Sequence, residues 1–262
     1  MIVIKYGGHA LPKANEPDEI LSVIARHHLE GNKVVLVHGG GPQIDAELTL
    51  HGIEKEMVSG YRYTTPEVFE VVQQVLSGQV LRTLTNCLTG LGVLSIGLSA
   101  ADARLITAKK FSPVVEGVET DIGLVGDIDA VNPEILTLLL ESGYLPVVSP
   151  VAVNASGQGL NVNADIAAGA IAGALQVDEV IFMTDVAGIY RNWPDINSVI
   201  SEISKAELAS LQPSFSEGMV PKVKAALNAL ESGAKKVRII DGRDAANLAN
   251  ALLGFGGTVV LP

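Results

Sequence analysis

Short runs of aliphatic and β-branched residues alternate with longer helical patterns along most of the chain, and this alternation constrains the fold most. The runs carry few polar side chains, as strands do when both faces of a parallel sheet are covered. The expected strands are residues 2–5, 34–37, 93–98, 145–153, 180–183 and 237–240. The expected helices are residues 18–30, 42–51, 65–76, 132–142, 164–175, 205–211 and 221–232. The alternation predicts an α/β fold with right-handed crossovers.

One segment breaks this pattern. Residues 114–132 alternate apolar and polar side chains with glycines between them, which predicts antiparallel hairpin strands. A polar, glycine-containing loop at residues 154–159 marks a soft boundary. It divides the chain into an N-terminal lobe, 1–155, and a C-terminal lobe, 156–262.

The composition excludes several classes of protein. The 262-residue chain is 48% hydrophobic, so it can bury a sizeable core. Its formal net charge of −11 argues against a nucleic-acid-binding protein. Cys87 is the single cysteine, so no intrachain disulfide can form and a reducing compartment is expected. The longest charge-free stretch, residues 142–164, contains prolines and glycines and would be a poor membrane span. No signal peptide precedes the first strand, and we expect a soluble, cytoplasmic protein.

Two glycine turns follow expected strands. Gly39–Gly41 lie between a buried strand and a helix, where glycines let the backbone approach a ligand and the helix start directs free N–H groups at it. Gly7 and Gly8 follow the first strand, with Lys5 at its end. An ordinary tight turn and a solvated lysine are the simpler alternatives. Ligands of open α/β sheets bind beyond the carboxyl ends of the strands, so the two turns could flank one polyphosphate. The GxGxxG and P-loop motifs are both absent.

Further polar side chains gather at other element ends. Arg62 precedes a helix start and offers a fork for a carboxylate or phosphate, although a plain surface arginine is equally compatible with this stretch. Asn161, Asn163 and Asp165 crowd the start of a helix whose body is Ala, Ile and Gly and is therefore buried. Capping accounts for one of the three. The GxxxG at residues 169–173 predicts close packing between two elements of the fold.

The C-terminal lobe repeats the combination of strand end and polar turn. Asp185 follows the strand 180–183, and Gly218 and Lys222 stand at the start of a later helix. A lysine in a first helical turn is unfavourable against the helix dipole, and a bound anion would reverse that effect. His38 is interpreted as a structural histidine at a strand end. The histidines and Cys87 show no metal-ligand spacing, and no metal site is expected.

In their order along the chain, these motifs resemble the amino acid kinase family and, within it, the N-acetylglutamate kinases of arginine biosynthesis. The resemblance implies a three-layer αβα sandwich with a mostly parallel central sheet. It also implies an amino-acid-substrate and dimerisation lobe at 1–155 and a nucleotide-binding lobe at 156–262. The matching segments are KYGGHAL (5–11), HGGGPQID (38–45), GYRYT (60–64), NVNAD (161–165), TDVAGIY (184–190), GMVPKV (218–223) and IIDGR (239–243).

The resemblance also implies the reaction and its residues. ATP, with Mg²⁺ carried by the nucleotide, would transfer its γ-phosphoryl group to the side-chain carboxylate of N-acetyl-L-glutamate. The implied catalytic residues are Lys5, Lys222 and Asp165, with Asp165 holding both lysines. The other implied contacts are Gly8, Gly40 and Gly41 with the moving phosphate, Gly40, Gly41, Arg62 and Asn161 with the amino-acid substrate, and Asp185, Gly218, Met219 and Lys222 with the nucleotide. A carboxylate is ionised at pH 7 and needs no general base, so such catalysis rests on positioning and electrostatics.

Two departures from the family pattern bear on regulation and the substrate side. Residues 100–103, Ala-Ala-Asp-Ala, stand where relatives often have Gly-Lys-Asp-Gly. The N-terminal helix of the arginine-inhibited hexamers does not precede the first strand, and a homodimer insensitive to arginine is expected. Three alternatives stay open: an acetylated or carrier-linked aminoadipate or glutamate as acceptor, a non-catalytic nucleotide or amino-acid sensor of the same fold, and a nicotinamide oxidoreductase.

Overall fold

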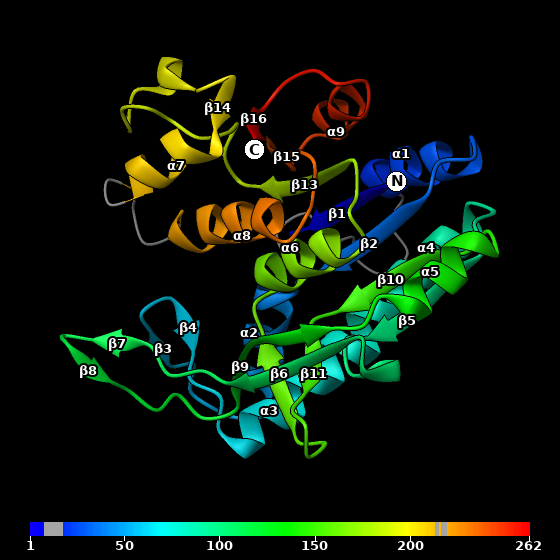
Figure 1. Ribbon diagram of the computed structural model, residues 1–262. Coiled ribbons are helices and arrows are strands. Elements are labelled where there is room, and N and C mark those ends of the chain that lie inside the picture. Colours follow the sequence, from blue (N-terminus) through cyan, green and yellow to red (C-terminus); the bar gives the residue numbers. More distant parts are fainter. Residues whose placement is uncertain (8–17, 213–214, 216–218) are drawn as a thin grey trace.

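The computed structural model describes residues 1–7, 18–212, 215 and 219–262 (Figure 1). The helices are α1 (Glu19–Leu29), α2 (Gly41–Leu50), α3 (Pro66–Gln73), the π-helical η2 (Gln74–Val80), α4 (Leu81–Gly90), η3 (Asp102–Arg104), α5 (Glu134–Glu141), α6 (Ala164–Ala174), η4 (Ile196–Ser198), α7 (Lys205–Leu211), α8 (Val220–Glu231) and α9 (Ala245–Leu252). The strands are β1 (Ile2–Tyr6), β2 (Val34–His38), β3 (Met57–Val58), β4 (Tyr61–Arg62), β5 (Ser95–Ser99), β6 (Ile106–Lys110), β7 (Val114–Val115), β8 (Val118–Glu119), β9 (Val125–Val131), β10 (Leu145–Ser149), β11 (Val151–Val153), β12 (Gly159–Val162), β13 (Glu179–Thr184), β14 (Glu202–Ser204), β15 (Val237–Asp241) and β16 (Thr258–Leu261).

A central sheet runs through both halves of the chain in the order β14-β16-β15-β13-β1-β2-β10-β5. Its pairs from β15 to β5 are parallel, and β16 is antiparallel to β15. The predicted α/β class with a mostly parallel sheet is confirmed. After β1, the chain adds β2 along one edge of β1, and β13 later pairs with the opposite edge of β1. The carboxyl end of β1 is therefore the topological switch point, where ligands of such sheets bind.

Helices cover both faces of this sheet and produce the three-layer sandwich (Figure 1). Successive side chains of a strand point to opposite faces. On β1, Val3 accordingly belongs to the core under α5, α6, α7 and α8, whereas Ile4 belongs to the core under α1, α2, α3, α4 and α9. The same alternation separates Lys5 from Tyr6, which lies in the second core.

The predicted continuous strand at residues 145–153 is wrong. The segment divides at Pro150 into β10, which joins the central sheet, and β11, which joins a closed barrel with β6, β9 and β12. Proline has no N–H to donate to a continuing ladder, so a change of direction is least costly there. The predicted antiparallel character of residues 114–132 is confirmed, because β7 pairs with β8 and β9 pairs with β6.

Two small residues bring α6 and α8 into close contact, as the GxxxG predicted. A Cβ at Gly169 would lie 2.7 Å from the carbonyl oxygen of Ala225, and a Cβ at Gly173 would collide with Ser232. Glycine at these positions therefore lets the two helix axes approach each other. Since the contacts advance along both helices in the same direction, their N-terminal ends also lie together. This packing places Asp165 near Lys222.

The loop after β5 contains a strained residue, Ala103, and offers a stability test. Its φ of 50° lies in the left-handed region. Such a conformation costs an L-residue roughly 1–2 kcal/mol. Its side chain is exposed, so Ala103→Gly loses no packing. We expect a net stabilisation of about 0.5–1 kcal/mol after the unfolded-state entropy of glycine is counted.

Ala101→Gly is the matched control for this test, because Ala101 has a φ of −74° and gains nothing from glycine. Urea unfolding of both variants measures the difference in the free energy of unfolding. Equal or lower stability of Ala103→Gly relative to wild type contradicts the expectation.

Candidate active site

Two lysines share one buried carboxylate at the carboxyl end of β1. Lys5 Nζ lies 2.9 Å from Asp165 Oδ1, and Lys222 Nζ lies 3.9 Å from Asp165 Oδ2. The side chains are 10%, 7% and 20% exposed for Lys5, Asp165 and Lys222. Oδ1 accepts no hydrogen bond of regular geometry, so the contact with Lys5 is best described as an ion pair. Among the described residues, the cluster combines two cations with one anion, and the Lys5 and Asp165 side chains are largely buried.

Asn163 leaves the Asp165 carboxylate available for this task. Its side-chain oxygen caps α6 by accepting hydrogen bonds from the backbone N–H groups of Asp165, at 2.8 Å, and Ile166, at 3.3 Å. An N-cap satisfies donors that the helix itself cannot pair. Because Asn163 performs the capping, Asp165 can turn its carboxylate to the two lysines.

The glycine turn after β2 presents unpaired backbone donors. Gly40 is the N-cap of α2 and Gly41 its first residue, and their N–H groups donate no hydrogen bond within the part of the chain that the structure describes. A Cβ at Gly40 would lie 2.7 Å from the Leu76 side chain, so a larger residue there would have to displace that side chain. A Cβ at Gly41 would meet none of the described residues within 4 Å. The predicted phosphate-binding Gly8 and nucleotide-binding Gly218 lie outside the described residues; Met219 is the N-cap residue of α8.

Arg62, on the short hairpin β3–β4, is held by α2. Its Nη2 forms an ion pair with Asp45 Oδ1, and Lys55 Nζ donates to Asp45 Oδ2 at 2.7 Å. Burial alone would raise the pKa of Asp45, but the hydrogen bonds from Lys55 and Arg62 outweigh it, and the pKa lies below its ordinary value. Nη1 of Arg62 is buried and has no hydrogen-bond partner in the described part. Leaving such a donor unpaired is costly, and a ligand carboxylate would relieve that cost.

Thr64 joins Arg62 to Asn161, and the sequence analysis gave it no role. Its hydroxyl donates to the carbonyl oxygen of Arg62 at 2.8 Å and accepts from Asn161 Nδ2 at 3.3 Å. The two predicted substrate-binding residues, from β4 and β12, therefore lie on either side of one buried threonine. Thr64 lies inside the GYRYT motif, and this position was the sequence signal that could have identified it as a site residue.

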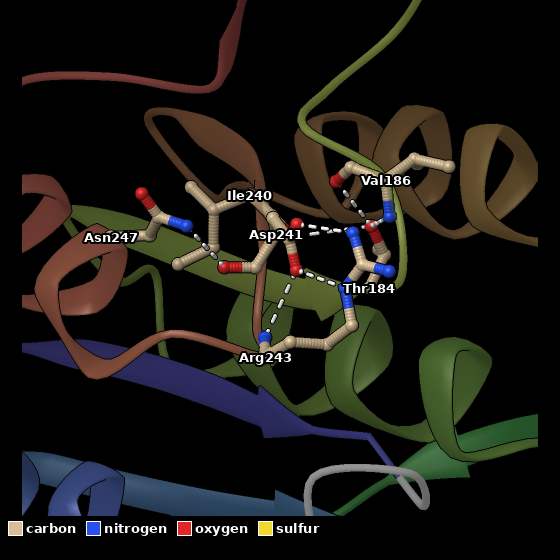
Figure 2. A network of polar contacts seen from close by, with 6 residues as sticks. All are labelled: Thr184, Val186, Ile240, Asp241, Arg243 and Asn247. Carbon is tan, nitrogen blue, oxygen red and sulfur yellow. Dashed lines mark hydrogen bonds and ion pairs between the residues drawn. The ribbon is translucent and has the colours of Figure 1, made fainter.

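The predicted nucleotide-binding Asp185 is exposed just beyond β13, beside a polar network at the end of β15 (Figure 2). Thr184 Oγ1 donates to the carbonyl oxygens of Val186, at 2.9 Å, and Ile240, at 3.1 Å, and so fixes the turn that carries Asp185. Arg243 pairs with both carboxylate oxygens of Asp241 at 2.9 and 2.6 Å. These hydrogen bonds hold the pKa of Asp241 below its ordinary value. Both residues lie in the IIDGR segment, but no role was predicted for this pair.

An aromatic contact connects α8, which carries Lys222, with the β3–β4 hairpin, which carries Arg62. The Lys224 ammonium, on α8, lies 5.6 Å from the centroid of the Phe111 ring, and the Phe111 ring lies 4.8 Å from that of Tyr61. Tyr61 directly precedes Arg62 on β4. The helix that carries Lys222 is thus linked, through the Phe111 ring, to the hairpin that carries Arg62.

His38, at the end of β2, is completely buried. Its Nδ1 lies 2.8 Å from the carbonyl oxygen of Gly39, and burial lowers its pKa from 6.5 to about 4. The imidazole is therefore neutral at pH 7. Among the described residues, no three His, Cys, Asp or Glu side chains are grouped so that they could hold a metal ion.

Acidification should weaken the fold through His38. The unfolded chain binds a proton near pH 6.5 and the folded chain only near pH 4, so this contribution is complete above pH 6.5 and is lost as the pH falls toward 4. We expect a loss of about 2 kcal/mol between pH 6.5 and about 4.5. Urea unfolding of wild type and His38→Asn at several pH values measures this loss. The difference between their free energies of unfolding isolates His38, because both proteins contain the same carboxylates. A difference independent of pH would contradict the assignment.

Comparisons with known proteins identify the family of the chain. Residues 1–241 match the sequence profile described as the amino acid kinase family. The chain is 42% identical over 264 aligned positions to an acetylglutamate kinase of Corynebacterium glutamicum, covering 100% of this chain and 90% of the relative. It is 44% identical over 264 positions to an acetylglutamate kinase of Rhodococcus jostii, covering 100% and 86%.

Solved structures show the same fold. A Streptococcus mutans protein superposes with a TM-score of 0.80 at 27% identity and covers 99% of this chain and 98% of its own. An N-acetylglutamate synthase of Neisseria gonorrhoeae, bound to coenzyme A and N-acetyl-glutamate, gives a TM-score of 0.85 at 24% identity, and this chain spans 59% of its length. Giardia carbamate kinase gives 0.69 at 20% identity and covers 99% of this chain and 98% of its own.

Proposed function

The chain belongs to the amino acid kinase family, and on that premise we propose that it transfers the γ-phosphoryl group of ATP to the side-chain carboxylate of N-acetyl-L-glutamate. The product is the acyl phosphate, N-acetyl-L-glutamyl 5-phosphate, and the reaction is a step of arginine biosynthesis. The observation that carries the proposal is the Lys5–Asp165–Lys222 cluster at the end of β1. The turn with Gly40 and Gly41 follows the neighbouring parallel strand β2, and the N–H groups of these glycines have no partner among the described residues. The names of the most similar relatives support this acceptor.

The arrangement suits phosphoryl transfer between two anions. An ionised carboxylate attacks phosphorus without a base, and His38, which is buried and neutral, is not placed to act as one. What the reaction needs is charge neutralisation around the transferred group. Lys5 and Lys222 supply it from two elements, and Asp165 keeps the two ammonium groups from repelling each other.

Each lobe has its own task. The N-terminal lobe, 1–155, binds the acceptor: Arg62 pairs with the α-carboxylate through its free Nη1, and Asn161, just past the lobe boundary, contacts the acceptor from β12. The C-terminal lobe, 156–262, binds the nucleotide through Asp185, Gly218, Met219 and Lys222. The described residues offer no cage of acidic or histidine ligands, so Mg²⁺ would be held by the ATP phosphates, which is the usual way Mg²⁺ is bound in such sites.

We also propose a homodimer in the cytoplasm. Among the described strands, β5 pairs with β10 alone and forms one edge of the central sheet, where a second copy could pair. The single cysteine, Cys87, fits a reducing compartment. No helix of the described part has the length and apolar character that crossing a membrane requires. Light scattering tests the dimer.

The test of the function is hydroxamate formation from ATP, Mg²⁺ and N-acetyl-L-glutamate, since hydroxylamine traps an acyl phosphate. N-acetyl-L-aminoadipate and carrier-linked aminoadipate and glutamate, assayed in parallel, test the alternative acceptors. Lys222→Ala should lower the rate about 10²-fold, the typical cost of losing one transition-state contact. Lys235→Ala is the matched control, because Lys235 is 68% exposed and pairs with Asp178 far from the site.

The outcomes separate the alternatives. Wild-type turnover of N-acetyl-L-glutamate with loss in Lys222→Ala supports both reaction and site. Faster turnover of the aminoadipate analogue would keep the kinase and change the acceptor. A wild type that is silent with every acceptor but binds ATP would replace the kinase by a sensor of the same fold.

A further inference from the structure

His38 is joined to the backbone of the glycine turn that follows it. Its Nδ1 lies 2.8 Å from the carbonyl oxygen of Gly39. Because a carbonyl can only accept, Nδ1 must carry the hydrogen. The other ring nitrogen, Nε2, is buried and without a hydrogen-bond partner in the described part of the chain. The ring therefore has one polar contact in the described residues, and that contact is to the turn.

This contact fixes the direction of a second group. The carbonyl of Gly39 and the N–H of Gly40 belong to one planar trans peptide and point in opposite directions. With the carbonyl held by the His38 ring, the Gly40 N–H is directed away from that ring. The side chains of Leu36, on β2, and Tyr6, on β1, lie in the core under α2. His38 follows Leu36 by two residues and therefore faces the same side of the sheet, whereas the Lys5 side chain lies on the side covered by α6 and α8. The N–H is thus turned away from the His38 side.

A turn made of glycines needs such a restraint. Glycine accepts both signs of φ at little cost, so three consecutive glycines permit the required conformation without fixing it. Within the described residues, the backbone of Gly39 and Gly40 has two further hydrogen bonds: Gly39 N–H donates to the carbonyl oxygen of Tyr6 at 3.1 Å, and the carbonyl oxygen of Gly40 accepts from Ile44. Neither involves the peptide unit between Gly39 and Gly40. The His38 ring is the group that restrains it.

We propose that His38 is a positioning residue for phosphoryl transfer, which by holding the Gly39 carbonyl orients the Gly40 N–H toward the transferred phosphoryl group. The role rests on the proposed function. A preorganised donor lowers the barrier only if it already points to where charge develops in the transition state. If the peptide unit were free to rotate, kcat would therefore fall while substrate affinity changed little.

The test compares substitutions that differ in where they place a donor. His38→Asn puts an amide N–H near the position of Nδ1, His38→Gln puts one near Nε2, and His38→Leu has none. We expect kcat in the hydroxamate assay to fall by about tenfold or more in the Leu and Gln variants and to stay within about threefold of wild type in the Asn variant. KM for ATP should change less than about twofold in all three, and unfolding midpoints identify any variant that fails to fold.

The Gln variant keeps the test decisive if His38→Leu does not fold, because it retains a polar side chain of similar size. Equal kcat in the Asn and Gln variants overturns the positioning role. Long-range ¹H–¹⁵N NMR of the wild type provides a readout independent of activity: a neutral ring protonated at Nδ1 supports the role, and one protonated at Nε2 overturns it. A wild type without kinase activity overturns the proposed function itself. The NMR measurement is independent of activity, so the two failures can be distinguished.

Discussion

Lys5→Met is expected to lower kcat about 10³-fold, the upper end of the cost of removing one transition-state contact. Lys5 is the closer of the two cations to Asp165, at 2.9 Å, and its side chain is 10% exposed. Its charge therefore acts in a medium that screens it little. Methionine keeps the length and apolar stem and removes only the ammonium group. The hydroxamate assay at saturating substrates measures the loss, and a fall of less than about tenfold would contradict a catalytic role.

The same substitution should destabilise the fold for a different reason. Without Lys5, the Asp165 carboxylate, which is 7% exposed, keeps one cationic partner among the described residues, Lys222 at 3.9 Å. Removing one partner of a buried ion pair costs about 3–5 kcal/mol, and the remaining lysine should reduce this to about half. The double substitution Lys5→Met with Asp165→Asn removes the uncompensated charge. It should recover most of the stability, measured by urea unfolding, and none of the activity.

That separation identifies what each charge does. Activity that returns with stability would mean that Lys5 supports the fold alone, and the assignment of phosphoryl contacts to it would be wrong. Asp165→Asn by itself provides the reference. In that variant the lysines face each other without a carboxylate between them, so both activity and stability should fall.

Local sequence patterns predicted the central strands β1, β2, β10, β13 and β15, because these are mostly aliphatic runs buried on both faces. They also located β5, but they missed β14 and β16, which are less buried. They did less well where tertiary context decides. The helix expected to end at Leu76 continues as the π-helical η2 and then α4, although Gly78 reads as a helix breaker. The reason is packing: Leu76 and Val80 bury their side chains against the Gly40 turn. A propensity scale has no access to that contact.

The sequence predicted which residues belong to the candidate site better than it predicted which of them contact one another. Strand-end and helix-start positions identified Lys5, Asp165 and Lys222 individually, but their convergence depends on α6 and α8 packing across Gly169. Asp45 lies inside the quoted HGGGPQID and Arg62 inside GYRYT, yet their ion pair joins residues from separate elements. Thr64 was missed for the same reason, because its partner Asn161 is 97 residues away. Asp241 and Arg243 are only two residues apart, so their proximity could have been expected from IIDGR.

Arg62→Ala is expected to raise KM for the acceptor about 10²-fold while changing KM for ATP less than about twofold. A hydrogen bond to a charged group contributes about 1.5–3 kcal/mol, which corresponds to roughly 10- to 150-fold in affinity. The fold should persist, because Asp45 is one-third exposed and keeps Lys55 as a partner. Arg62→Lys should not restore affinity, because a single ammonium drawn to Asp45 cannot also reach the ligand as a fork does.

Lys55→Ala is the matched control for this effect. It removes the other partner of the same carboxylate, from a side chain that is 47% exposed, and leaves the guanidinium of Arg62 in place. Its acceptor KM should stay within about threefold of wild type, the range expected for a surface ion pair. If Lys55→Ala and Arg62→Ala raised KM equally, Asp45 rather than the free Nη1 would be the group that matters. The guanidinium would then serve to hold α2 against the hairpin, and the acceptor carboxylate would have to be bound elsewhere.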